Sequence, residues 1–80
     1  RLTQLEQKIV ELITPVVSDL GLEVLWVGYK GGILSVYAEN PKTGKINLEE
    51  CTKISREISP LLEVEDPISG EYNLEVHLLV

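Results

Sequence analysis

The chain contains little cysteine and little positive charge. Its 80 residues include one Cys and no Met or Phe, and 13 acidic side chains outnumber 7 basic ones. One Cys cannot form an internal disulfide, so we expect a reducing compartment, the cytoplasm. The net charge of −6 opposes sequence-independent binding to phosphate, which relies on clustered Lys and Arg. A basic protein partner is therefore favoured over naked RNA.

Long apolar runs are also missing. No stretch reaches the roughly 18 to 20 residues that span a bilayer, and the amino end lacks the pattern of a signal peptide. We therefore expect a soluble chain that does not bind membranes. Its length predicts one small domain over residues 1–80, able to bury only about 60% of its extended surface.

A capping-box pattern begins the first predicted element. Thr3 is followed three residues later by Glu6, and apolar residues then recur at helical spacing until Gly21. This pattern predicts an amphipathic helix over residues 3–20. Pro15 lacks an amide hydrogen, so we expect a kink there.

Two runs rich in Val, Leu and aromatic residues follow, at 22–29 and 33–39. Lys30-Gly31-Gly32 separates them and can reverse the chain, so the pair predicts a β-hairpin. Alternation divides the first strand into one face with Leu25, Val27 and Tyr29 and another with Val24, Trp26 and Gly28. In the second strand, we expect Leu34, Val36 and Ala38 to face the helices and Ile33, Ser35 and Tyr37 to face away.

A second helix is predicted after the turn-rich loop at 40–45. Asn47 and Glu50 repeat the capping-box logic, and Pro60 lies near the expected end. The residues expected to face inward are Leu48, Cys51, Ile54, Ser55, Ile58 and Leu62.

A loop and a last strand complete the predicted elements. Pro67 disfavours helical geometry at Asp66, which we expect to be extended. In the strand that follows, Tyr72, Leu74 and Val76 alternate with Asn73, Glu75 and His77.

These elements predict an α+β fold, a two-layer sandwich in the order α-β-β-α-β, with both helices on one face of a three-stranded sheet. Counting chain reversals makes the last strand parallel to the second. We favour the strand order 2-1-3, because the first strand is apolar on both faces and therefore suits the centre. A crossover that places the last strand beside the second is the alternative.

The titratable residues do not form a pattern that predicts catalysis. His77 has no second His at metal-ligand spacing, and Cys51 is expected on the inward side of a helix, away from His77. Carboxylates are numerous, but they are explained by a helix start and a solvated loop; they are Glu49, Glu50, Glu63, Glu65, Asp66 and Glu71. Neither glycine cluster has the spacing of a nucleotide-binding loop. We therefore predict no catalytic, cofactor or metal site.

Four residues are candidates for contacting a partner. Trp26 is expected with Tyr37 on the uncovered sheet face, where Val24 and Ile33 would complete an apolar patch. The alternatives are that Trp26 packs inward and Leu25 outward, or that the patch merely covers the sheet. Lys53 and Arg56 lie one turn apart on the exposed side of the second helix and are candidates for local RNA contact. Neighbouring glutamates on that helix cancel much of their field.

The stretch 62–76 carries a family resemblance. It reads Leu-Glu-Val-Glu-Asp-Pro-Ile-Ser-Gly-Glu-Tyr-Asn-Leu-Glu-Val and resembles the N-terminal domain of the ribosome maturation factor RimP family, whose members carry an acidic-Asp-Pro-Ile-x-Gly-x-Tyr-x-Leu-Glu-Val run. Further similarity lies in Leu34-Ser35-Val36-Tyr37, Glu50-Cys51 and Ser55-Arg56-Glu57-Ile58. Where the family has Ile-Asp, this chain has Ala38-Glu39.

The resemblance changes after Val76. The family continues with Ser-Ser-Pro-Gly into a second, Sm-like barrel domain, whereas this chain continues with His77-Leu78-Leu79-Val80. We therefore expect a RimP-like N-terminal domain without the barrel. Leu78, Leu79 and Val80 are expected to extend the last strand.

The resemblance implies a non-catalytic assembly factor for the bacterial small ribosomal subunit. Its implied partners are that subunit and a basic ribosomal protein near the decoding region. Local contact with ribosomal RNA through Lys53 and Arg56 is a further candidate, and no cofactor or small-molecule substrate is expected. A generic RNA-binding domain of the KH type is the alternative. That alternative requires a Gly-x-x-Gly clamp between helices, whereas the one such tetrapeptide in the sequence, Gly28-Tyr29-Lys30-Gly31, falls in the predicted hairpin.

Overall fold

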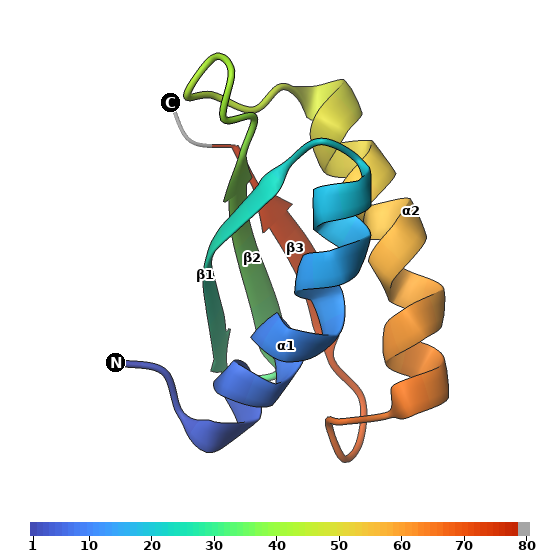
Figure 1. The fold of residues 1–80 in the computed structure, drawn as a ribbon. Coiled ribbons are helices and arrows are strands. Elements are labelled where there is room, and N and C mark those ends of the chain that lie inside the picture. The colour runs from blue at the N-terminus through green and yellow to red at the C-terminus, as the bar shows by residue number, and fades with distance from the viewer. Residues whose placement is uncertain (79–80) are drawn as a thin grey trace.

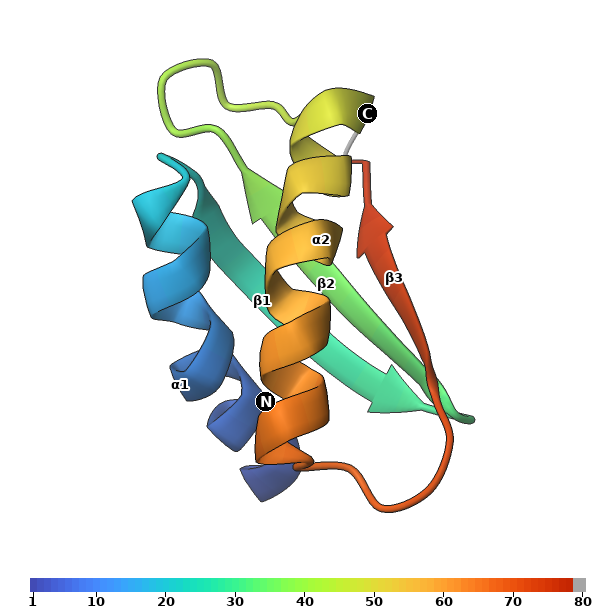
Figure 2. The same cartoon turned by 90° about the vertical axis from the view of Figure 1, so that its right-hand side faces the viewer.

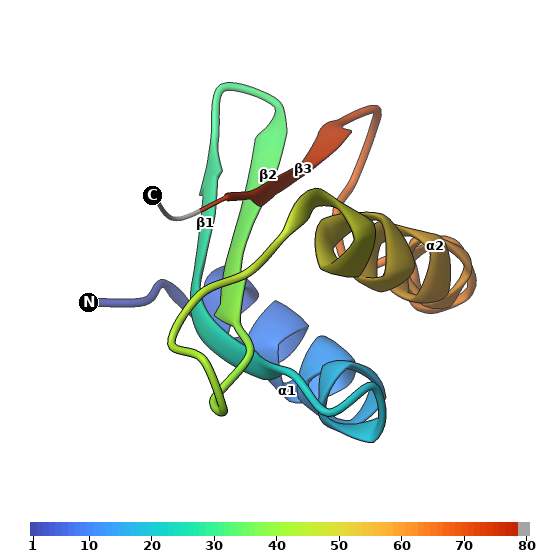
Figure 3. The same ribbon diagram turned by 90° about the horizontal axis from the view of Figure 1, so that it is seen from above.

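The computed structural model describes residues 1–78. In chain order, the elements are α1 (Gln4–Asp19), β1 (Glu23–Lys30), β2 (Ile33–Glu39), α2 (Leu48–Glu65) and β3 (Asn73–His77). Both helices lie on the same side of the sheet (Figures 1 and 2), and the view from above shows the two layers (Figure 3). The predicted α+β fold and element order are therefore confirmed. Leu78 follows β3 without joining it, and the pairing predicted for Leu79 and Val80 lies outside the described residues.

Both predicted capping boxes are present. The Thr3 hydroxyl accepts the Glu6 amide at 3.1 Å, and the Glu6 carboxylate accepts the Thr3 amide at 2.9 Å. Asn47 and Glu50 make the same reciprocal pair at the start of α2, at 2.7 and 3.0 Å. These bonds satisfy amides that have no partner within a helix, so each helix begins where its sequence predicts. α1 continues through Pro15 to Asp19, and the kink stays a prediction.

The hairpin has the two-residue turn that its glycines favour. Gly31 and Gly32 have φ values of 60° and 76°, the left-handed region that such a turn requires at both positions. The turn places Lys30 opposite Ile33 and sets the register of the two strands.

A β-bulge in β1 changes which residues face the helices. Val24 pairs with Ala38 and Trp26 pairs with Tyr37, so Leu25 is the extra residue between two successive pairs. The prediction that Leu25 faces the helices and Val24 faces away was therefore wrong. Leu25 is 42% exposed, whereas Val24 packs against the core.

The predicted strand order 2-1-3 was also wrong. The observed order is β1-β2-β3, with β3 parallel to β2, as the count of reversals had predicted. The apolar run in β1 had suggested a central strand, but the bulge explains it, because two consecutive residues at a bulge, here Leu25 and Trp26, can share a face. Bulges are frequent at sheet edges, and β1 is an edge strand.

The core lies between the sheet and the helices. β2 contributes three fully buried side chains, Leu34, Val36 and Ala38, as predicted. The other fully or almost fully buried side chains come from both helices, β1 and three loops; they are Ile9, Ile13, Val17, Leu22, Val27, Ile46, Cys51, Ile54, Ile58, Leu62 and Ile68. α1 packs against β1, and α2 packs against β3 and α1.

Two local predictions around α2 were wrong. Leu48 is 70% exposed as the first residue of the helix, and the buried side of α2 begins at Cys51. Asp66 is not extended but left-handed, with φ 45° and ψ 53°, and its amide bonds to the carbonyl of Leu62. Asp tolerates this conformation, which ends the helix and still avoids the right-handed geometry that the following proline disfavours.

Candidate functional site

The outer face of the sheet, which is the face turned away from both helices, is the candidate site. Trp26 is 43% exposed and pairs with Tyr37, and Ile33 at the hairpin end is 38% exposed. The predicted positions of these three side chains are confirmed. Val24 is absent from the patch because of the bulge, and Leu25 takes a place at its margin instead.

A hollow of about 780 Å³ opens on the outer face. Its floor is the cross-strand pair Gly28–Ser35, which is flanked along the hairpin by the larger pairs Trp26–Tyr37 and Lys30–Ile33. Two small residues between two large pairs leave space that no side chain fills. A Cβ at Gly28 would meet the Trp26 Nε1 at 3.8 Å, so the indole lies beside this floor at ordinary contact distance.

β3 supplies the other wall of the hollow. Parallel pairing places Glu75 beside Ser35 and His77 beside Tyr37. The His77 ring stacks on Tyr37 with centroids 4.5 Å apart and an interplanar angle of 14°. Its Nε2 lies 3.3 Å from Glu75 Oε1, close enough for an ion pair when the ring is protonated but without the geometry of a hydrogen bond.

Glu6 connects α1 to the strand beneath the hollow. Its Oε2 accepts the amide of Tyr29 at 2.8 Å, while its Oε1 accepts the amide of Thr3. Hydrogen bonds from the Thr3 and Tyr29 amides lower the pKa of this carboxyl, because they favour the charged form. The carboxylate therefore stays ionised, and it positions β1 rather than offering a free group to a ligand.

Lys53 and Arg56 do not join the outer face. Both are exposed on α2, which covers the opposite side of the sheet. Arg56 borders a separate groove between α2 and β3, together with Ser55 and Val76. The structure therefore brings together two of the predicted contact residues, Trp26 and Tyr37, and places the other two on another surface.

Cys51 and His77 lie on opposite faces of the sheet. Burial raises the pKa of the Cys51 thiol, and the nearby Glu50 carboxylate adds to that shift, so the unreactive thiol form is favoured. Within residues 1–78, no group of three or more His, Cys, Asp or Glu side chains is arranged to hold a metal ion.

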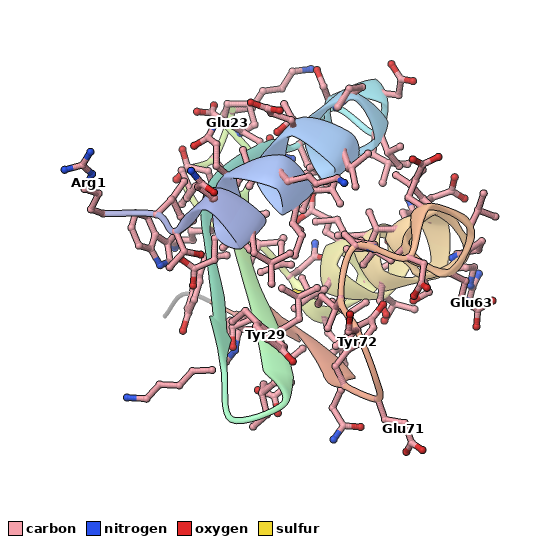
Figure 4. The ribbon with its side chains drawn as sticks, turned by 90° about the horizontal axis from the view of Figure 1, so that it is seen from below. Arg1, Glu23, Tyr29, Glu63, Glu71 and Tyr72 are labelled. Atoms are coloured by element: carbon pink, nitrogen blue, oxygen red, sulfur yellow. The ribbon has the colours of Figure 1, made fainter. Side chains whose placement is uncertain are left out.

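The loop before β3 lies at the hairpin end of the molecule. Figure 4 shows Tyr72 near the end of α2, with Glu63 and Glu71 pointing outward on either side. Burial, followed by the Glu63 and Asp66 carboxylates, raises the pKa of the Tyr72 phenol. Tyr72, the last residue before β3, packs against the core.

Glu75 and the Gly28–Ser35 floor were not predicted as site residues. The floor could have been found from the sequence, because a two-residue turn at Gly31-Gly32 fixes Gly28 opposite Ser35. Glu75 could not, because its position beside Ser35 depends on the strand order.

The sequence of the chain matches a known protein family. Residues 12–77 match the family model described as the RimP N-terminal domain. The chain belongs to the RimP N-terminal domain family. This match contains all three strands, α2 and the second half of α1, and it gives the chain a general role in ribosome maturation.

The RimP match includes every residue of the outer-face hollow except Glu6. In the part of the chain that the structure describes, no helix is both long enough and apolar enough to cross a membrane.

Proposed function

We propose that this chain supports maturation of the bacterial small ribosomal subunit by binding it, without catalysing a reaction. The observation that carries the proposal is the family match over residues 12–77. The binding is to the subunit through a basic ribosomal protein, and it takes place in the cytoplasm, where bacterial ribosomes are assembled.

Charge and surface support a protein partner. The chain carries a net charge of −6, and complementary fields speed the encounter with a basic protein. The outer face has a partly exposed indole beside a tyrosine, and aromatic side chains of this kind are enriched among residues that dominate binding energy. The contact residues we propose are Trp26 and Tyr37, with Lys53 and Arg56 as a separate surface for local contact with ribosomal RNA.

Co-sedimentation with purified immature and mature small subunits tests this function. We expect the wild-type chain to sediment with the immature particle at low salt and to dissociate as salt rises, since screening weakens attraction between exposed charges. Trp26→Ala should reduce binding while circular dichroism shows an intact fold. If the chain binds neither particle at any salt concentration, the proposed function is wrong for this domain.

A variant with Lys53 and Arg56 reversed in charge distinguishes binding through α2 from binding through the outer face. Lys53→Glu combined with Arg56→Glu should leave association with the basic protein unchanged and weaken only contact with RNA. If this double variant abolishes binding and Trp26→Ala does not, phosphate contact through α2 is the main interaction.

A further inference from the structure

The outer face carries two features that the fold does not need. One is the hollow above the Gly28–Ser35 pair. The other is the pair Glu23–Glu39, in which like charges lie directly opposite each other on β1 and β2. Such pairs destabilise an antiparallel ladder. Ala38 is fully buried on the helix side, so alternation places Glu39 and its partner on the outer face.

The hollow has the shape and chemistry of a site for a slender cationic side chain. Its floor is small, one wall is formed by Trp26 and Tyr37, and the Glu75 carboxylate lies on the β3 side. The stem of an Arg or Lys side chain can pack along aromatic rings while its charged end reaches a ring face or a carboxylate.

The balance of charge on this face favours a cation. Glu23, Glu39 and Glu75 lie on it, and among the described residues that line the hollow the one base is Lys30, at the hairpin end. The Glu6 carboxylate also borders the hollow, but both of its oxygens already accept amides. The outer-face carboxylates of Glu23, Glu39 and Glu75 outnumber the basic side chains of Lys30 and His77, so the face disfavours phosphate and therefore RNA.

The distance between the floor of the hollow and the Glu23–Glu39 pair fits an extended chain. Ser35, at the floor of the hollow, and Glu39 lie four residues apart on β2. At about 3.3 Å per residue, this places them roughly 13 Å apart. An extended peptide has the same rise, so side chains four positions apart on one of its faces match this distance.

We propose that the outer face binds an extended segment of a basic protein through two cationic side chains four residues apart. One enters the hollow beside Glu75, and the other lies between Glu23 and Glu39. Trp26 and Tyr37 pack against the residues between them. This inference rests on the proposed function and names the chemistry that its basic partner presents.

A peptide titration tests the inference directly. The probe is a capped peptide of Ser, Thr and Val with two arginines separated by three residues, and Trp26 emission reports binding because the chain has one Trp. We expect saturable binding that weakens as salt rises. A peptide with the two arginines adjacent should bind about threefold or more weakly, although its charge is the same.

Filling the hollow gives a matched pair of variants. Gly28→Val places a branched side chain over the floor and suits a strand, so the fold should persist while the affinity falls about tenfold. Gly28→Ala adds one carbon at ordinary contact distance from the indole and should bind much like the wild type. The melting temperature of each variant shows that the fold is intact.

Neutralising one carboxylate of the Glu23–Glu39 pair should raise the stability of the fold and weaken peptide binding. Glu39→Gln removes the like-charge repulsion, so we expect Tm to rise by about 2 °C while peptide binding weakens. A residue with only a structural role would not gain stability and lose binding together.

Each outcome separates the inference from the proposed function. If the chain sediments with small subunits but Gly28→Val sediments equally well and the peptide leaves Trp26 emission unchanged, the inference is overturned and the function stands. If the spaced-arginine peptide binds as expected but the chain does not sediment with subunits, the inference stands and the function fails. Equal binding of both arginine spacings, or displacement of the peptide by oligouridine at similar concentration, overturns the inference.

Discussion

Glu6 shows how one residue can stabilise two elements. The same carboxylate completes the capping box of α1 and accepts the Tyr29 amide of β1. The sequence indicates the first contact, because Thr3 and Glu6 have capping-box spacing. The second contact joins residues far apart in the chain, so it depends on how α1 packs against the sheet.

Replacing Glu6 with Gln should therefore destabilise the domain by about 1 to 2 kcal/mol at neutral pH. The amide oxygen of Gln can accept one backbone N–H, but its NH₂ group cannot accept the other. Urea unfolding measures the loss. Gln4→Glu, at an exposed position in the first turn, is the control and should change stability little.

The effect of pH on the stability difference between wild type and Glu6→Gln follows from the lowered pKa of Glu6. A carboxyl whose pKa is lower in the folded state contributes stability that is present above its unfolded pKa and is lost as pH falls through the folded value. The stability gap between wild type and Glu6→Gln should therefore shrink in acid. If the stability difference between wild type and Glu6→Gln stays constant as pH falls through the folded pKa of Glu6, the role given to the carboxylate is contradicted.

At the scale of elements, the bulge in β1 separates what alternation predicts from what the strand does. The turn residues correctly predict the hairpin and place Trp26, Ile33 and Tyr37 on the outer face. Alternation counted through Leu25 then assigns the wrong face to Val24. A run of consecutive apolar residues indicates either a strand covered on both sides or a bulge, and only the pairing distinguishes them.

Substitutions at Val24 and Leu25 test which of these two side chains faces the core. Val24→Ser should cost about 1 kcal/mol or more, because Val24 packs against the core, whereas Leu25→Ser should stay within about 0.5 kcal/mol. Urea unfolding of both variants under the same conditions gives the comparison. A larger loss for Leu25→Ser would support regular alternation without the bulge.

At the scale of the whole molecule, strand order determines which residues form the candidate site. With β2 in the centre, β1 contributes the indole and β3 contributes Glu75 and His77 to the same face. With β1 in the centre, Glu75 would not lie beside Ser35. The hollow therefore depends on long-range strand pairing, although most of its lining residues belong to the hairpin.

Amide hydrogen exchange should report this order. Both edges of β2 are hydrogen-bonded to neighbouring strands, so its amides should exchange more slowly than those of β1 or β3. Measurement by NMR on the native chain distinguishes the strands residue by residue. Slowest exchange in β1 would favour the order 2-1-3 instead.

The sequence by itself determined the kinds of element, both helix starts, the hairpin register and the outer placement of Tyr37. These features depend on neighbours within a few residues, through capping, turn geometry and alternation. Only the tertiary structure decided the bulge at Leu25, the left-handed Asp66 and the position of β3 beside β2. The position of β3 depends on how α2 packs while it connects two strands, and local periodicity does not record that long-range packing.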